Sequence, residues 1–204
     1  MGRIKSTGLT DALRAQFARN QADLYLDIDE ALLRDSTESD PVGAAIAAGT
    51  YLGITDGGVN IQNGPQMGTL NGDGISENDK GSQFLTDFEA MIEADLVTIS
   101  QTVLLLLYNN ATATDLGNGL TVIETDMQGT DALTYGTNMA AVVDYGLEAT
   151  DKMVLLLRNT ITESGIDLQT AHRESATLPL SVRGTFDYET PTLPPMSIFT
   201  PSAV

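Results

Sequence analysis

The residue types that carry most enzymatic chemistry are scarce in this chain. Its 204 residues include no cysteine and a single histidine, His172, which is followed by Arg173 and Glu174. A catalytic histidine needs an oriented partner and a nucleophile. The sequence also lacks the G-x-S-x-G elbow, the P-loop, a G-x-G-x-x-G after a strand, and the H-E-x-x-H zinc motif. We therefore expect a surface histidine and a protein that is not an enzyme.

Carboxylates are the one reactive group in excess. The chain has 28 acidic and 10 basic residues, so choosing two carboxylates as a glycosidase pair would be arbitrary. Tryptophan is absent, which disfavours a stacking platform for sugars or single-stranded nucleic acid. Residues 71–79, NGDGISEND, are rich in glycine and acids but lack the spacing and final glutamate of an EF-hand. A solvated turn is favoured there over a metal site, and no cofactor is expected.

The formal net charge of -18 argues against nucleic-acid binding by charge attraction, which requires Lys and Arg on phosphates. It favours solubility and suppresses chance association. The longest apolar runs, residues 103–107 and 153–157, are far shorter than the ~20 residues of a membrane helix. Residues 2–20 lack the apolar core of a signal peptide. The absence of cysteine fits assembly in a reducing cytoplasm, and no membrane partner is expected.

The stretch around which the chain is organised is residues 82–109. Its first half alternates apolar or small residues with acids, a period of two that predicts a strand with one covered and one acidic face. Asp95 or Thr98 is expected to cap a following helix, whose apolar residues recur at helical spacing. These are Leu96, Ile99, Val103, Leu106 and Leu107. A helix folded back on a β-layer would form a core.

The chain before this stretch predicts further β-structure. Residues 9–20 suit a short helix, and residues 23–30 alternate as a strand with a carboxylate-rich outer face, although a helix over 22–33 is an alternative. Residues 36–49 are expected to be a linker or loop. Residues 50–62 predict a hairpin that turns at Asp56-Gly57-Gly58. The glycine-rich residues 64–81 predict a long loop, with a short strand near 67–70.

The chain after it continues the pattern. We expect a loop over 109–118, a short strand over 120–124, turns over 125–137, and a strand or helical turn over 138–147. Residues 152–163 predict a strand that forms a second hairpin with 166–172 through Ser164-Gly165. Residues 176–188 predict a last strand in which Pro179 lies at an edge or a strand start. The Pro-rich tail from residue 189 should run extended over a surface.

Evenly spaced strands and turns predict one mainly β domain, a sandwich or barrel with a flanking helix. Exposed sheet edges must be paired or protected, and closed ring symmetry is one way in which copies of a chain pair them. The carboxylates of one face would then line a cavity. In the alternative interpretation, the same carboxylates are surface charges that keep a monomer soluble.

Five features follow one another in a defined order. They are the G-T-Y-L-G-x-T-D-G-G-V hairpin at 49–59, the Gly- and acid-rich loop at 64–81, the strand and helix at 82–109, L-P-L-S-V-R within 176–188, and the Pro-rich end. In this order of features the chain resembles the major tail tube proteins of long-tailed, siphovirus-like bacteriophages. The likeness covers roughly residues 49–109 and 151–201, whereas 1–48 and 110–150 match nothing in the family.

The resemblance implies a two-sheet β-sandwich with a flanking helix, whose hexameric rings stack into the tail tube of the virion. The tube would assemble in the host cytoplasm and bind the tape measure, tail terminator and distal tail proteins. Genomic DNA would pass through it without specific binding. The carboxylates expected to face the lumen are Asp27, Asp29, Asp87, Glu89 and Glu93.

The same resemblance implies that the long loop contacts the next ring and that residues 1–48 and 189–204 act as terminal arms. The loop residues expected at this contact are Gly68, Gly72, Asp73, Gly74, Glu77, Asp79 and Lys80. The alternatives are another virion component, such as a tail-completion or head-decoration protein, or an acidic β-sandwich that binds carbohydrate or a host surface.

Overall fold

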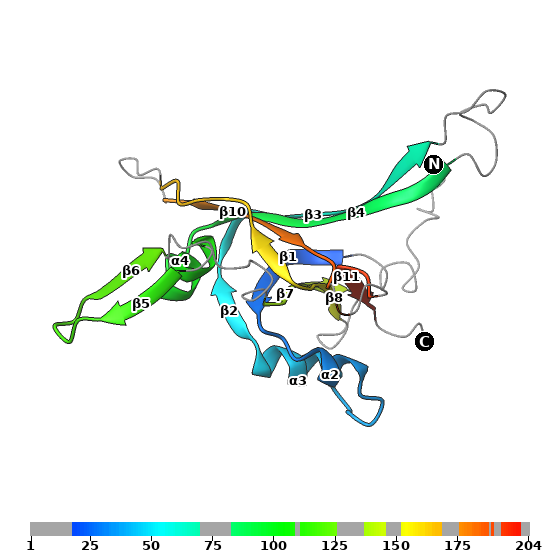
Figure 1. Cartoon of the computed structure of the whole chain (residues 1–204). Helices are drawn as coiled ribbons and strands as arrows, with labels where there is room; N and C mark the ends of the chain where they lie inside the picture. Colours follow the sequence, from blue (N-terminus) through cyan, green and yellow to red (C-terminus); the bar gives the residue numbers. More distant parts are fainter. Residues whose placement is uncertain are drawn as a thin grey trace, which may run out of the picture.

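In the computed structural model, the chain folds mainly into antiparallel β-strands with a few short helices (Figure 1). The structure describes residues 18–69, 83–108, 111–125, 137–145, 152–168, 176–187, 189 and 193–200. In chain order the elements are β1 (Ala18–Leu26), α2 (Glu30–Arg34), α3 (Pro41–Ala48), β2 (Thr50–Gly53), β3 (Thr55–Thr69), β4 (Gln83–Leu96), α4 (Gln101–Leu107), β5 (Ala111–Asp115), β6 (Thr121–Thr125), β7 (Met139–Tyr145), β8 (Lys152–Leu157), β9 (Thr160–Thr162), β10 (Leu178–Gly184) and β11 (Met196–Phe199).

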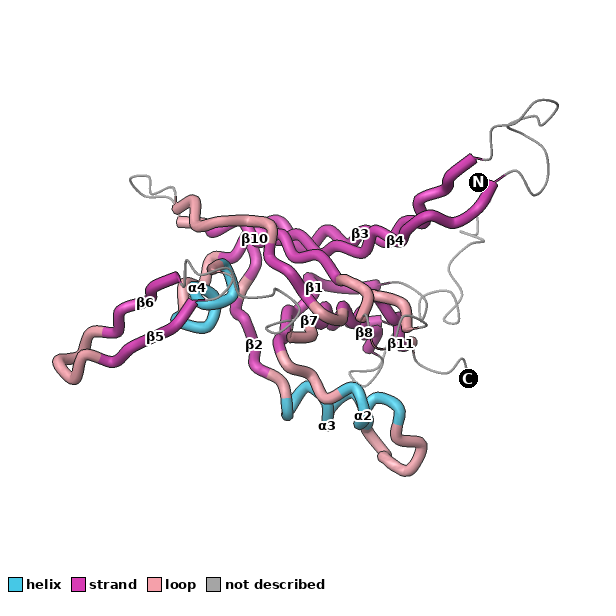
Figure 2. The backbone as a smooth tube through the Cα atoms, in the orientation of Figure 1, coloured by secondary structure: helices cyan, strands magenta, loops and turns pink. Residues whose placement is uncertain are grey.

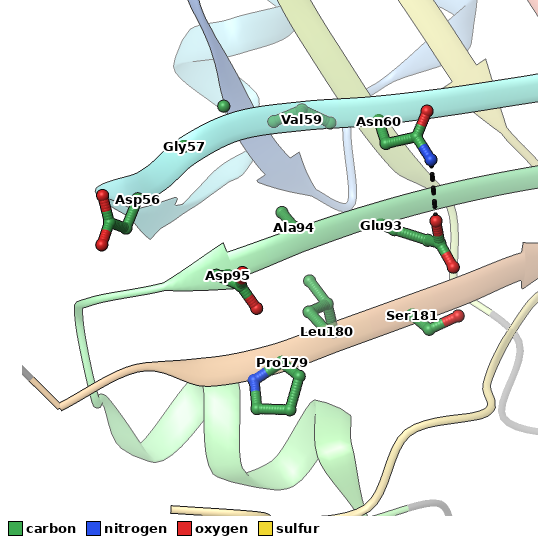
Figure 3. Close-up of a pocket in the computed structure, with 11 residues that line it drawn as sticks. Asp56, Gly57, Val59, Asn60, Glu93, Ala94, Asp95, Pro179, Leu180 and Ser181 are labelled. Carbon is green, nitrogen blue, oxygen red and sulfur yellow. Dashed lines mark hydrogen bonds between the residues drawn. The ribbon is translucent and has the colours of Figure 1, made fainter. Parts of the chain in front are cut away.

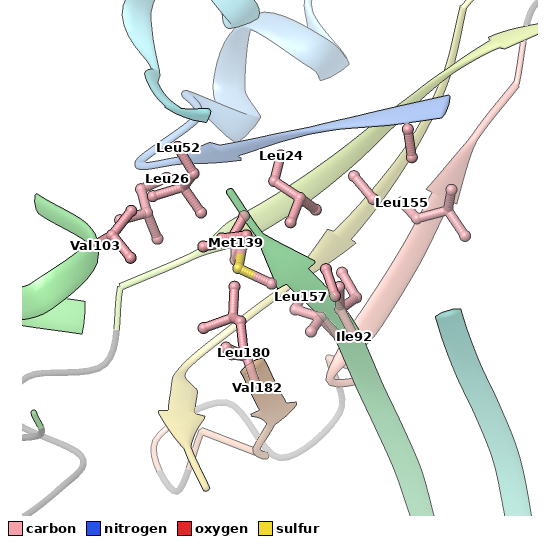
Figure 4. Packing of buried hydrophobic residues seen from close by; sticks show 14 of the residues in the cluster. Leu24, Leu26, Leu52, Ile92, Val103, Met139, Leu155, Leu157, Leu180 and Val182 are labelled. Atoms are coloured by element: carbon pink, nitrogen blue, oxygen red, sulfur yellow. The ribbon is translucent and has the colours of Figure 1, made fainter. Parts of the chain in front are cut away.

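Two sheets pack face to face. One has five strands in the order β11-β8-β7-β1-β2, and the other has four in the order β3-β4-β10-β9. Leu24 and Leu157 of the first sheet share one buried cluster with Ile92 and Leu180 of the second (Figure 4). The helix α4 adds Val103 to this cluster. The expected β-sandwich arrangement of packed antiparallel sheets is thus consistent with the structure.

Alternation in β4 explains how that strand forms the core. Every second residue from Ala90 to Leu96 is buried, while the residues between them are half-buried or exposed. The prediction of a strand with one covered face and one polar face is confirmed here, as it is for Leu24 and Leu26 in β1. The following helix begins later than expected, because Ser100 caps it by accepting a hydrogen bond from the N–H of Val103.

A helical layer covers the outer face of the five-stranded sheet. Ile28 and Ala45 pack there against Ala140, Val142 and Leu156. The strands β7 and β8 are therefore covered on both faces, which explains why their sequences are apolar runs and do not alternate. A helix at 41–48 contradicts the loop predicted for 36–49. Its proline lies in the first turn, where a missing N–H costs nothing, and Asp40 caps it through the N–H of Gly43.

Two predictions are wrong because the chain passes from one sheet to the other: the hairpin at 50–62 and the continuous strand at 152–163. The strands β2 and β3 belong to different sheets, so residues 50–62 form no hairpin. The chain crosses at Gly53, whose φ is 123°, and Asp56-Gly57-Gly58 forms a bulge within β3. Likewise β8 and β9 lie in different sheets, and the chain bends between them at Asn159, which has a φ of 48°.

Other boundaries also differ from expectation. Residues 64–69 continue β3, residues 111–115 form β5 in place of a loop, and residues 18–20 begin β1 and do not end a helix. Residues 163–168 contain no strand, which removes the described part of the second predicted hairpin. The strand at 121–125 fits the prediction for 120–124, and the strand at 139–145 decides between the strand and the helical turn left open for 138–147. Pro179 lies near the start of β10, and the tail supplies the edge strand β11. The predictions for residues 9–17, 71–79 and His172 lie outside the described residues.

Candidate assembly surface

The outward face of the four-stranded sheet carries a row of acidic and amide side chains. Glu89 and Glu93 lie four residues apart on β4, so they share this face. Asn60 lies opposite Glu93 in the ladder and donates a hydrogen bond from Nδ2 to its Oε2 at 2.8 Å, while Gln62 donates to the same oxygen at 3.4 Å. Gln66 Nε2 donates to Glu89 Oε2 at 3.1 Å. These bonds fix the carboxylates in position and leave their charge in place.

Arg183 on β10 is the single cation among the described side chains of this face. Its guanidinium lies 3.6 Å from Glu89 and 3.1 Å from Glu163. Against it stand the carboxylates Asp56, Glu89, Glu93, Asp95 and Glu163, so five negative charges and one positive charge leave a net of -4. The face is therefore acidic as well as wet.

One end of this face is hollowed. A depression of about 570 Å³ lies over the bulge in β3, and Asp56, Glu93 and Asp95 line it together with Pro179 (Figure 3). Asp56 lies directly opposite Asp95 in the ladder, a pairing of like charges that is unfavourable within one molecule. Within the described part of the chain, no group of three potential ligands is arranged to hold a metal ion.

The edges of the same sheet are open. Among the described strands, none pairs with the outer edge of the 15-residue β3, and the opposite edge is the three-residue β9. The edge of β3 lacks the lysines that commonly protect such strands. It does contain Pro65, opposite Phe88, and proline is tolerated on an edge because it has no N–H to donate.

The strands β3 and β4 run on past the core as a two-stranded ribbon, here called the arm (residues 63–69 and 83–89). It projects away from the sandwich (Figure 2). From Asn63 to Thr69 the side chains are exposed or half-buried, and Met67 is 54% exposed. The arm leads into residues 70–82.

A second, smaller ribbon projects from the opposite end of the molecule in Figure 1. Among the described strands, β5 and β6 pair only with each other. Their turn contains Gly117 and Gly119, both with positive φ, and exposes Leu116 and Leu120. We call residues 111–125 the β5–β6 hairpin.

A buried arginine holds the C-terminal strand on the five-stranded sheet. Arg158 donates from Nε and Nη2 to the two carboxylate oxygens of Glu30 at 2.7 and 2.5 Å, from Nη1 to the carbonyl of Pro194 at 2.6 Å, and from Nη2 to Ser197 Oγ at 2.8 Å. The hydrogen bond from Arg158, opposed by partial burial and helped by Arg34, lowers the pKa of Glu30 below its ordinary value. Residues 194–199 are thereby fixed on their own subunit.

The structure brings together some of the predicted lumen residues and separates others. Glu89 and Glu93 share the acidic face, and Asp87 lies on the same strand, opposite Gln66. Asp27 and Asp29 lie elsewhere: Asp27 follows β1 with a φ of 54°, and Asp29 caps α2 by accepting from the N–H of Ala31. The prediction that both stand on a strand face is wrong, because β1 ends at Leu26.

Among the predicted inter-ring residues, Gly68 lies in β3, paired with Phe84. The others lie outside the described residues; they are Gly72, Asp73, Gly74, Glu77, Asp79 and Lys80. Sequence reasoning missed Asn60, Gln62 and Arg183 as members of the acidic face. Their position in an alternating strand was the available signal, but it gives no cross-strand partner until the register is known.

No protein-family model matches the chain, and no curated protein matches its sequence. None of the helices in the described residues is both long enough and apolar enough to cross a membrane.

Proposed function

We propose that this chain is a self-assembling structural subunit that forms rings by joining its four-stranded sheets edge to edge. The observation that carries the proposal is the sheet itself, which combines a 15-residue edge that no described strand pairs with, a very short opposite edge and a polar outward face. The edges are different strands, so their union is a head-to-tail contact, and such contacts close into rings when the rotation per copy fits. The result would be a barrel whose wall is one continuous sheet.

The acidic face of each subunit would line the inside of this barrel. DNA carries one negative charge per ~1.7 Å of helix axis. A wall with a net charge of -4 per subunit on its described side chains repels the phosphates, so DNA passes without adhering. The hydrogen bonds from Asn60 and Gln62 to Glu93 hold its carboxylate against the wall.

The arm would join one ring to the next. It projects beyond the packed core, and its side chains from Asn63 to Thr69 are exposed or half-buried in the described part of the subunit. Together with the family resemblance stated above, these features support the major tail tube protein of a siphovirus-like bacteriophage. Hexameric rings, residence in the virion tail, and binding of tape measure, terminator and distal tail proteins are parts of the same proposal.

Negative-stain electron microscopy of the purified chain tests the proposal. Rings or stacked tubes are the expected result, and a monomer that persists at high concentration would overturn it. A shortened arm tests the stacking role separately. Residues 65–88 are replaced by Asn-Gly, which removes most of the arm and connects the ladder partners Gly64 and Glu89 with a two-residue hairpin turn. This variant should remain folded by circular dichroism and form single rings, whereas tubes of unchanged length would refute the role of the arm.

A further inference from the structure

The β5–β6 hairpin is a two-stranded ribbon that the described part of its own subunit leaves largely uncovered. All side chains of β5 except that of Ala111 are exposed, and in β6 only Val122 and Ile123 are half-buried. A single hairpin is marginally stable in water, and a third strand or a packed surface is usually needed. Leu116 and Leu120 at its turn are 55% and 62% exposed, although the polar residues Asn118 and Asp115 already satisfy the turn backbone. The hairpin therefore exposes a surface of the kind that is usually buried in a contact.

The position of the hairpin suggests which surface is its partner. It projects from the end of the molecule opposite to the arm (Figure 1). The same end exposes Ile54, where β2 passes into β3, and Ile99, where β4 passes into α4, at 61% and 45%. A stack of identical subunits needs two different surfaces at opposite ends, each complementary to the other.

The distribution of charge limits which surfaces of two copies of the chain can form a contact. The chain carries a net charge of -18, so most pairs of its surfaces repel each other. Residues 116–123 of the hairpin, LGNGLTVI, contain no charged side chain, and residues 59–69 of β3, which include the first strand of the arm, contain none either. Both segments also expose apolar side chains, those of Leu116 and Leu120 in one and Met67 in the other. A contact confined to these two uncharged segments avoids the repulsion that opposes other contacts, although the second strand of the arm carries Asp87 and Glu89.

We infer that the β5–β6 hairpin is the receiving surface for the arm of a second copy of this chain, in the next ring of the stack. The inference rests on the proposed function and adds to it the partner surface of the arm. The exposed leucines of the turn would be buried against the neutral part of β3 around Met67. The acidic side chains of the hairpin, Asp115 and Glu124, would lie at the border of the contact, where water solvates them.

The test compares two double variants of the full chain. Leu116→Asp with Leu120→Asp places two charges on the turn, and Leu168→Asp with Leu193→Asp makes the same change at two other exposed leucines, 45% and 43% exposed. Both should keep the melting temperature of the unassembled subunit. The first should raise the protein concentration at which tubes appear by at least ~100-fold, from the lost burial of two leucines, and leave single rings. The control should stack like the wild type.

Cross-linking identifies the occupant. The chain has no cysteine, so Met67→Cys and Leu120→Cys chains can be mixed and treated with a short bismaleimide. A product containing one copy of each is expected, and a Met67→Cys with Leu193→Cys mixture should give none. Four outcomes would overturn the inference: unchanged stacking of the Leu116→Asp with Leu120→Asp variant, loss of its rings as well as its stacks, tubes without the mixed product, or a cross-link to Leu193→Cys. A wild-type chain that forms no assembly would overturn the proposed function, and the inference with it.

Discussion

Replacement of Arg158 by methionine is expected to loosen the attachment of the C-terminal strand. The arginine side chain is only 10% exposed and makes four hydrogen bonds, two to Glu30, one to the Pro194 carbonyl and one to Ser197. Methionine fills a similar volume but satisfies none of these groups.

The expected cost follows from the groups left behind. Removal of one partner of a buried ion pair typically costs 3–5 kcal/mol, and loss of a hydrogen bond to a buried carbonyl about 1 kcal/mol. Glu30 is 25% exposed and keeps Arg34 at 2.7 Å, so its share is reduced. We expect about 3 kcal/mol of lost stability, measured by urea unfolding of the unassembled subunit as a midpoint shift of about 1 M.

The same pair makes a signed prediction about pH. The folded-state pKa of Glu30 is lowered from 4.5, so its contribution to stability is present above that value and is lost as pH falls through the lower, folded pKa. The wild type should therefore lose more stability than Arg158→Met when pH is lowered from 5 through this window. Arg158→Lys keeps the charge and should fall between the two. A methionine variant within about 0.5 kcal/mol of the wild type, or one with an unchanged acid profile, would refute the assigned role of the pair.

Two further predictions concern the crossing between sheets and the acidic face. Gly53→Ala should destabilise the subunit by at least about 2 kcal/mol in urea unfolding, because φ is 123° and a Cβ would lie 2.4 Å from Cβ of Thr98. Gly57→Ala is the control and should cost less, because φ is also positive there but a Cβ meets nothing within 4 Å. Equal costs would contradict the steric argument. Glu89→Lys with Glu93→Lys should leave ring formation intact yet make assembled tubes retain DNA in a salt-sensitive manner, and tubes that still release DNA in a filter-retention assay would contradict a lumen position for this face.

The local pattern of the sequence was sufficient to predict which face of a strand is buried and which is exposed. A period of two in β1 and β4 predicted which side chains are buried, since neighbouring residues on an extended chain point to opposite faces. The same pattern predicted that Glu89 and Glu93 share a wet face. Composition was sufficient for the negative charge of the chain, which depends on no fold.

Only the tertiary structure decided which strands pair and which sheet each strand joins. The segments around Gly53 and Asn159 read as a hairpin and a single strand, but each carries the chain from one sheet to the other. Alternation does not record which sheet a strand joins, because burial on one face looks the same in both. Asp27 and Asp29 do not lie on the predicted strand face because β1 ends at Leu26. The end of a strand is fixed by its hydrogen bonds, which periodicity in the sequence does not record.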